Sequence, residues 1–175
     1  MNDQPDSADA LDAYGSGLAE RLGGNAVVEH DTVRIYLDRD AWYDTLRRAR
    51  DEEGLTFFSW LAGIDWSKDV AVGDAVEEPD ELEERFEVMC RLSSVENADA
   101  AQFIAVVPKD DAVIDSITEL FGGAEWHERE THDMFGIDFA GNLNLAPIYL
   151  PEGFIGHPLL KSYPLLAREV KPWPG

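Results

Sequence analysis

Two neighbouring stretches, RFEVMCRL at residues 85–92 and AQFIAVV at residues 101–107, carry the clearest structural signal in the chain. The first alternates between two sets of residues: Phe86, Val88, Cys90 and Leu92 in one, Arg85, Glu87, Met89 and Arg91 in the other. A period of two predicts a β-strand with one buried face and one wet face. The second stretch is almost continuously apolar and ends before Pro108, which is typical of a central strand.

Shorter patterns predict the elements that precede these strands. A helix that stops at Gly23-Gly24 is indicated by apolar residues at helical spacing, namely Leu11, Tyr14, Leu18 and Leu22. Residues 26–39, AVVEHDTVRIYLDR, predict two strands around a tight turn at His30-Asp31. Asp40 is placed to cap a helix that carries Trp42, Leu46 and Ala49 on one face. Residues 55–66, LTFFSWLAGIDW, predict a further strand.

The region after Pro108 completes the predicted domain. Asp110 or Asp111 is expected to cap a helix with one apolar stripe, formed by Val113, Ile114, Ile117, Leu120 and Phe121. The order of elements predicts an α+β fold, with a mainly antiparallel or mixed sheet and helices on one face. We expect this domain at residues 9–135, after a disordered lead-in at residues 1–8.

The last forty residues differ in composition from the rest. Residues 136–175 hold six of the nine prolines and have a formal charge of zero, in a chain whose net charge is −22. Prolines at this density exclude a long helix or a central strand, and the segment is too apolar for a solvated tail. We therefore predict an extended, Pro-rich C-terminal arm that packs on a partner protein. Packing of the arm on its own domain is the alternative.

The charge of the chain limits its possible partners. With 36 acidic and 14 basic residues, it repels phosphate groups, so neither nucleic acid nor an anionic membrane surface is an expected partner. Nine acids between Asp69 and Glu87 predict an acidic loop, and the wide spread of the others is compatible with adaptation to high salt. No stretch has the length and apolarity of a membrane-spanning helix, and no secretion signal is recognised, so the cytoplasm is expected.

A single cysteine limits the possible redox chemistry. Cys90 alone excludes an internal disulfide and a self-contained iron–sulfur cluster. Its position in the alternating strand predicts a small, buried, apolar residue.

Residues 124–137, AEWHERETHDMFGI, raise the question of a metal site or an acid–base site. His127 and His132 are five residues apart, so they point about 140° apart around a helix and cannot share one ion. Arg129 precedes Asp133 by four residues, a spacing suited to an ion pair, and Gly136 fits the position after a helix C-terminus. We predict a short, charged helix that anchors the arm and is not a catalytic site.

Two motifs resemble a known family. ERETHDMFGI at residues 128–137 resembles the E-R-E-x-x-D-M-F-G-I signature of the 30-kDa-type subunit of proton-pumping NADH:quinone oxidoreductase, respiratory complex I. LPEGFIGHPLLKSYPL at residues 150–165 is similar to that family's P-x-x-F-x-G-H-P-L-x-K-x-[FY] segment. The matched positions, which we expect to mark the partner interface, include Glu128, Arg129, Glu130, Asp133, Met134, Phe135, Gly136, Phe154, Gly156, His157, Pro158 and Lys161.

The resemblance implies a non-catalytic, structural subunit of the peripheral arm of a membrane-bound oxidoreductase. That complex transfers electrons from NADH to quinone and translocates protons. FMN, iron–sulfur clusters and quinone are expected in its other subunits, and no cofactor or active site in this chain. The implied partners are the large quinone-site subunit (49-kDa-type) and neighbouring cluster-bearing subunits. The implied location is the cytoplasmic side of the cell membrane, with attachment only through the complex.

Two alternatives remain open. The chain has Asn142 and Leu143 where the family usually has histidine and proline, and Leu160 where it has arginine. These departures would fit the equivalent subunit of a related membrane-bound hydrogenase, or of a quinone reductase with another electron donor. A remote alternative is a free-standing soluble hydrolase that uses Glu128, Glu130, His127 or His132.

Overall fold

The structure is a computed structural model that describes residues 7–71 and 79–165. Its helices are α1 (Ser7–Leu22), α2 (Trp42–Asp51) and α3 (Ala124–Phe135). Its strands are β1 (Asn25–Glu29), β2 (Thr32–Leu37), β3 (Phe57–Trp66), β4 (Arg85–Ser93), β5 (Ala100–Val107), β6 (Val113–Asp115) and β7 (Asp138–Ala140). The predicted lead-in lies mostly outside the described residues, as do parts of the predicted acidic loop and of the C-terminal arm.

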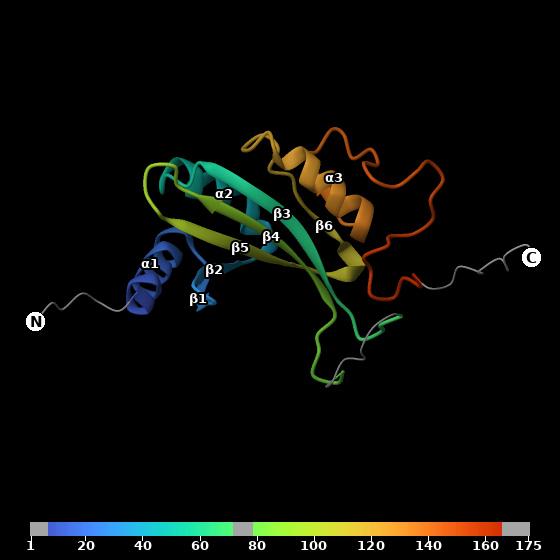
Figure 1. The fold of residues 1–175 in the computed structure, drawn as a ribbon, viewed down its shortest axis with the longest axis horizontal. Helices are drawn as coiled ribbons and strands as arrows, with labels where there is room; N and C mark the ends of the chain where they lie inside the picture. Colours follow the sequence, from blue (N-terminus) through green and yellow to red (C-terminus); the bar gives the residue numbers. More distant parts are fainter. Residues whose placement is uncertain (1–6, 72–78, 166–175) are drawn as a thin grey trace, which may run out of the picture.

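Five strands form one mixed sheet in the order β1-β2-β5-β4-β3 (Figure 1). Only the β2–β5 pair is parallel, and the other neighbours are antiparallel. β5 is the middle strand, as its apolar sequence predicts, and the α+β fold with a mixed sheet is confirmed. β6 and β7 form a separate parallel pair beside α3.

The β1–β2 hairpin turns where the sequence predicts. His30 and Asp31 have φ angles of 50° and 55°, the left-handed conformation that a two-residue hairpin loop requires. Glu29 and Thr32 then stand opposite each other, which fixes the register of the hairpin.

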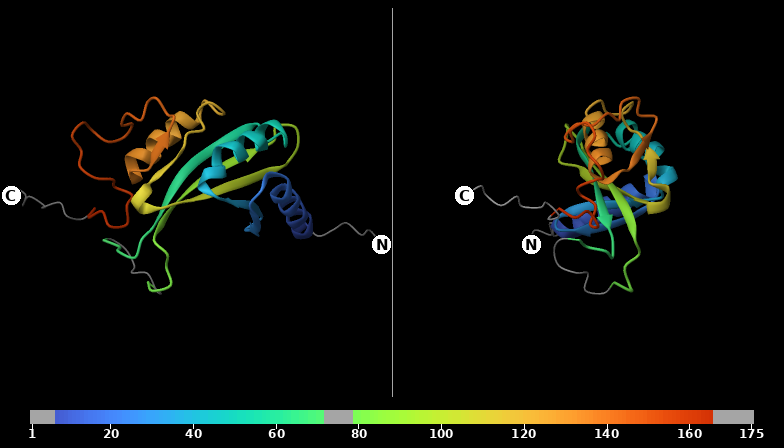
Figure 2. Two further views of the ribbon diagram at one scale, coloured as in Figure 1. Left: turned by 180° about the vertical axis from the view of Figure 1, so that it is seen from behind. Right: turned by 90° about the vertical axis from the view of Figure 1, so that its right-hand side faces the viewer.

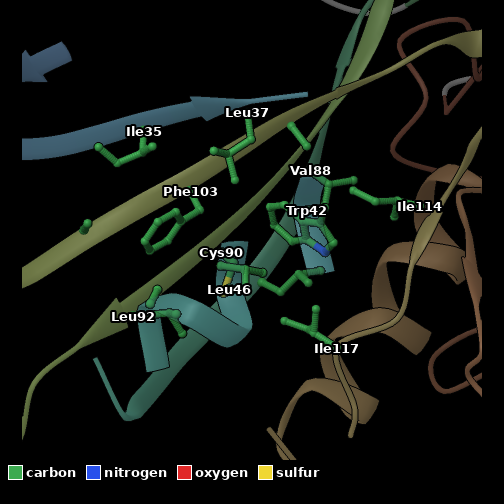
Figure 3. Packing of buried hydrophobic residues seen from close by; sticks show 14 of the residues in the cluster. Ile35, Leu37, Trp42, Leu46, Val88, Cys90, Leu92, Phe103, Ile114 and Ile117 are labelled. Atoms are coloured by element: carbon green, nitrogen blue, oxygen red, sulfur yellow. The ribbon is translucent and has the colours of Figure 1, made fainter. Parts of the chain in front are cut away.

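One face of the sheet carries the hydrophobic core. Alternate residues of β2, β4 and β5 point to this face and are buried: Val33, Ile35, Leu37, Val88, Cys90, Leu92, Phe103 and Ala105. Trp42 and Leu46 of α2 cover them (Figure 3). Cys90 has no exposed surface, which confirms its prediction as a small buried residue.

The other two helices pack on the same face. A Cβ at Gly15 of α1 would lie 3.0 Å from a methyl group of Val33. A Cβ at Gly63 of β3 would lie 3.1 Å from Thr131 and from Phe135 of α3. These short distances place the helices directly on the core face, at opposite ends of the sheet (Figures 1 and 2). The prediction of helices on one face is confirmed.

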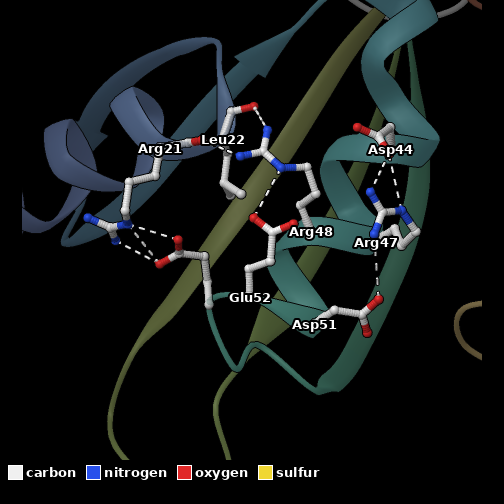
Figure 4. Close-up of polar contacts among 8 residues, drawn as sticks. Arg21, Leu22, Asp44, Arg47, Arg48, Asp51 and Glu52 are labelled. Atoms are coloured by element: carbon white, nitrogen blue, oxygen red, sulfur yellow. Dashed lines mark hydrogen bonds and ion pairs between the residues drawn. The ribbon is translucent and has the colours of Figure 1, made fainter.

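Arginine side chains join α1 to α2 (Figure 4). Arg21 donates two hydrogen bonds of 2.8 Å to Glu53, just beyond α2. Arg48 donates to the carbonyl groups of Arg21 and Leu22, at 2.5 and 3.1 Å, and so binds the C-terminal end of α1. The two helices are thereby held together at the edge of the core.

Two predictions of local structure are wrong. The predicted helix after Asp110 or Asp111 is instead a 3₁₀ turn, Lys109–Asp111, followed by the strand β6. Ile114 and Ile117 are buried as predicted, but β6 pairs with β7, which gives its backbone a partner that the local pattern does not show. Asp40 does not cap α2: it lies in a 3₁₀ turn, and α2 has no side-chain cap.

Candidate functional site

Helix α3 ends where its sequence predicts. Gly136 adopts a φ of 76°, and its N–H donates to the carbonyl of His132, which closes the helix in a left-handed C-cap. The helix buries two acids, Glu128 and Asp133, together with Ala124 and Thr131. Because a buried carboxylate is stable only when it is hydrogen-bonded, the partners of these acids define what the helix does.

Glu128 binds two segments that flank the helix in sequence. Its Oε1 accepts a hydrogen bond from the N–H of Ile117, and its Oε2 accepts from the hydroxyl of Ser116 and the amide of Asn142, each at 2.8 Å. Complete burial raises the pKa of this carboxyl, and the three donors oppose the rise. Asn142, where the chain departs from the family pattern, therefore has a structural partner inside the chain.

Asp133 holds the arm by its backbone. Its Oδ2 accepts hydrogen bonds from three successive N–H groups, those of Ile148, Tyr149 and Leu150, at 2.8, 3.0 and 3.2 Å. Burial alone would raise the pKa of Asp133, but these donors outweigh it and lower the pKa. Three donors on one charged oxygen bind a segment that has no regular secondary structure of its own.

Arg129 binds the residues just before that segment. Its guanidinium donates to the carbonyl groups of Ala146 and Pro147, at 2.8 and 3.2 Å, and lies 5.3 Å from the ring centre of Trp126. Arg129 and Asp133 do not form the ion pair that their spacing suggests. Instead, each binds backbone groups of the arm, the arginine its carbonyls and the aspartate its amides.

The second motif returns to the end of the same helix. His157 Nδ1 lies 2.8 Å from the carbonyl oxygen of Asp133, and the N–H of Leu159 donates to the carbonyl of Met134. The imidazole fits against Gly136, where a Cβ would lie 2.8 Å from Nε2. The two motifs, separate in sequence, therefore meet at the C-terminus of α3.

Asp65, which the sequence analysis did not single out, fixes the arm farther along. Its Oδ2 accepts a hydrogen bond from the N–H of Lys161 at 2.8 Å, and its Oδ1 lies 2.5 Å from the ammonium group of Lys109. The carbonyl of Lys161 accepts from the N–H of Ala71. One signal was available: Asp65 occupies a core-facing position of β3, in phase with Leu61 and Gly63, and a buried strand acid needs a partner.

The remaining residues of the second motif lie on or near the surface of the arm. Phe154 stacks on Tyr163 with ring centres 6.2 Å apart, and Gly156 packs against the same tyrosine with a φ of 88°. Pro158 is half-buried between His157 and Leu159. The matched residues thus divide between α3 and the segment that α3 holds.

The two histidines of α3 contact different parts of the chain. His127 Nδ1 lies 3.0 Å from the carbonyl oxygen of Leu61, whereas His132 Nδ1 lies 3.2 Å from that of Ile137, so the two rings bind different segments. In residues 7–71 and 79–165, no three His, Cys, Asp or Glu side chains are grouped to hold a metal ion. Nor is any helix within those ranges long and apolar enough to cross a membrane.

Comparison with known proteins assigns the chain to a family. Residues 35–169 match the family described as "Respiratory-chain NADH dehydrogenase, 30 Kd subunit". The chain belongs to this family. The match spans α3 and both motifs, and it confirms the resemblance drawn from them.

Relatives of this 30 Kd subunit family align over most of the chain. The C subunit of the NADH-quinone oxidoreductase of Citrifermentans bemidjiense is 42% identical, over 82% of this chain and 81% of the relative. The protein of the same name from Roseiflexus sp. is 35% identical, over 94% and 88%. NADH-quinone oxidoreductase subunit 5 of Thermus thermophilus is 36% identical, over 69% and 60%.

Solved structures show the same fold. A trypsin-resistant fragment of Nqo5 superposes with a TM-score of 0.57 and 23% identity, over 77% of this chain and 99% of the fragment. A chain of the membrane-bound sulfane sulfur reductase, an archaeal respiratory membrane complex, gives 0.58 and 21%, over 75% and 71%. At these identities the likeness concerns the fold alone.

Proposed function

We propose that the chain is the 30-kDa-type subunit of an NADH-quinone oxidoreductase and a structural component of the peripheral part of that complex. The observation that carries the proposal is the family match over residues 35–169, which relatives from such complexes support at up to 42% identity. The chemistry of α3 agrees with a structural role, because Glu128, Arg129 and Asp133 all bind segments of their own chain.

The arm is the surface that we propose for partner contact. Its backbone is held by α3 and β3, while large apolar side chains point to solvent: Leu143, Tyr149, Phe154, Ile155, Leu159 and Leu165. Ile155 is 88% exposed and Leu143 is completely exposed. Apolar residues collected on one segment, in a chain with so many acids, favour a covered surface. The proposed partner is the large quinone-site subunit, with cluster-bearing subunits as further neighbours.

The electron carriers of the proposed complex belong to its other subunits. FMN, the iron–sulfur clusters and the quinone would be bound there, and this chain would contribute assembly instead of an active site. It would lie on the cytoplasmic side of the cell membrane and be attached through the complex.

A second candidate is the equivalent subunit of a related complex with another electron donor or acceptor. The observation in its favour is the fold shared with a chain of the sulfane sulfur reductase complex, which superposes as well as the Nqo5 fragment does. The family match favours the first candidate.

Affinity purification tests the proposal. The chain is tagged at its N-terminus, membranes are solubilised gently at several salt concentrations, and mass spectrometry identifies what accompanies it. Flavin- and cluster-bearing subunits would support the first candidate, and hydrogenase-like or sulfur-reducing subunits the second. A chain that purifies alone at every salt concentration would overturn both and leave the hydrolase alternative.

A pair of variants tests the role of the arm. Ile155→Asp should reduce recovery of the partner subunits, because it places a charge in the proposed contact. Val95→Asp is the matched control: Val95 is 71% exposed in the β4–β5 turn, away from the arm, so recovery should not change. Equal recovery with both variants would contradict the proposed contact.

A further inference from the structure

Strand β3 is an edge of the sheet with an unpaired stretch in its middle. Among the strands that the structure describes, it pairs only with β4. The N–H and C=O of Leu61 point away from β4, toward His127 Nδ1, at 3.4 and 3.0 Å. Since residues two apart in a strand direct their backbone groups the same way, those of Gly63 also face the free edge. Outside the β3–β4 ladder, no hydrogen bond from the described residues reaches these groups of Gly63.

A hollow of about 130 Å³ opens beside this unpaired residue. Gly63 and Leu61 line it on the strand side, Met134 and Phe135 on the helix side, and Leu159 of the arm lines it as well. The walls are mostly apolar, and Leu159 is 52% exposed. The hollow has the size of one side chain, and residues of the edge strand line it.

One carboxylate stands at the hollow without a partner. Glu130 lines it, is half-buried, and takes part in no hydrogen bond or ion pair within the described part of the chain. Trp126, Glu130 and Met134 follow one another at intervals of four residues and form a stripe along the outer side of α3. Trp126 is 59% exposed. The acids that point inward from α3 all have donors, so Glu130 is distinguished by facing outward with none.

We infer that this edge receives an extended segment of a neighbouring subunit that carries a lysine or arginine. The segment pairs its backbone with Gly63 and extends the sheet beyond β3, a common way of binding a peptide. The aliphatic stem of its basic residue fills the hollow and its charge meets Glu130. Charge complementarity favours a basic residue in this segment, because the chain is strongly acidic and the hollow combines the carboxylate of Glu130 with apolar walls.

The inference rests on the proposed function, since it requires a neighbouring subunit. On either side of Gly63, His127 contacts backbone groups of Leu61, and the N–H of Lys161 donates to the side chain of Asp65. We expect the pairing to be centred on Gly63.

Photo-cross-linking in the intact complex tests the inference. A photoreactive amino acid replaces Leu159 at the rim of the hollow, the complex is purified from membranes, and mass spectrometry maps the cross-link. We expect a product with an extended segment of another subunit that contains lysine or arginine. A product within this chain, for example with residues 166–175, or no product at all would overturn the inference.

Charge reversal gives an independent measurement. Glu130→Lys should lower recovery of the neighbouring subunit by roughly tenfold, and reversing the cross-linked basic residue should restore it. Glu96→Lys, in the β4–β5 turn at the far end of the sheet, makes the same charge change and should have no effect. Unchanged recovery with Glu130→Lys would overturn the inference, while the proposed function would stand as long as the unaltered chain purifies with the complex.

Discussion

The carboxylate of Asp133 accepts hydrogen bonds from three successive backbone N–H groups of the arm. Asp133→Asn removes the charge that strengthens these bonds. We expect a loss of about 1–3 kcal/mol in the free energy that holds residues 148–150 in place. Hydrogen exchange measures it directly, as faster exchange of those three amides. Asp115→Asn, at an exposed position, is the control and should leave them unchanged.

The lowered pKa of Asp133 determines how the strength of the same contact changes with pH. A carboxyl whose pKa is lower in the folded state stabilises the fold when the pH is above its unfolded pKa. This contribution is lost as the pH falls through the folded pKa. Protection of the three amides should therefore hold at neutral pH and disappear in acid, below the ordinary value of 3.8. Protection that already disappears above pH 5 would contradict the assignment.

The contribution of Glu128 to stability changes with pH in the opposite sense. Burial raises its pKa above the ordinary 4.5, so its contribution to stability is full below that value and is lost as the pH rises through the folded pKa. Glu128→Gln cannot ionise. We expect the melting temperature of the native chain, relative to this variant, to fall as the pH is raised. A difference that does not change with pH would contradict the raised pKa.

A second substitution at Glu128 separates charge from hydrogen bonding. Glu128→Leu leaves the buried N–H of Ile117 without an acceptor, whereas glutamine retains one oxygen for it. The leucine variant should be less stable than the glutamine variant by about 1–3 kcal/mol, measured by urea unfolding. Equal stabilities would mean that another group, or water, accepts from Ile117.

At the scale of an element, the end of α3 depends on one glycine. Gly136→Ala imposes a left-handed φ on alanine and brings a Cβ to 2.8 Å from His157. Gly141→Ala imposes a similar φ of 90° in open space. We expect both to cost about 1 kcal/mol of backbone strain, and Gly136→Ala to cost more and to detach His157. Comparison of thermal unfolding, with the imidazole resonances of His157 by NMR, checks this.

The elements differ in how far sequence predicts them. β4 follows from its alternation and β5 from its continuous apolar run, because each pattern lies within the strand itself. The predicted helix after Asp110 or Asp111 fails because Ile114, Ile117 and Phe121 are buried at spacings that suit a helix, while backbone groups in its first part find distant partners. β7 pairs with β6 from more than twenty residues away, and Glu128 takes the N–H of Ile117. No local pattern contains either contact.

The candidate site is divided in the same way. Glu128 and Asp133 were found from their motif and the C-cap at Gly136 from its residue type, whereas Asp65 was not found. What the acids bind was not predictable, because an irregular segment offers no periodicity that would say which amide meets which carboxylate. The bond from Lys161 to Asp65 spans 96 positions of the chain. Only the three-dimensional arrangement shows that both motifs serve one segment.

At the scale of the whole molecule, acidic residues exceed basic ones by 22. Described arginines such as Arg21, Arg47 and Arg85 are already paired, so the surplus acids repel one another without local compensation. Screening should therefore stabilise the fold, and the melting temperature should rise between millimolar and molar salt. Sodium and potassium chloride should act alike if ionic strength is the cause. A melting temperature that does not respond to salt would contradict this account.

The three side chains that bind the backbone of the arm have a consequence for how its sequence can change. Asp133, Arg129 and Asp65 hold amides and carbonyls, and these groups are nearly the same whatever side chain a position carries. Substitutions at Tyr149 or Ile155 thus alter what the arm shows to its surroundings without loosening it. The side chains of the arm can therefore be substituted one at a time as the surface that they contact changes, while Asp133, Arg129 and Asp65 keep its backbone in place.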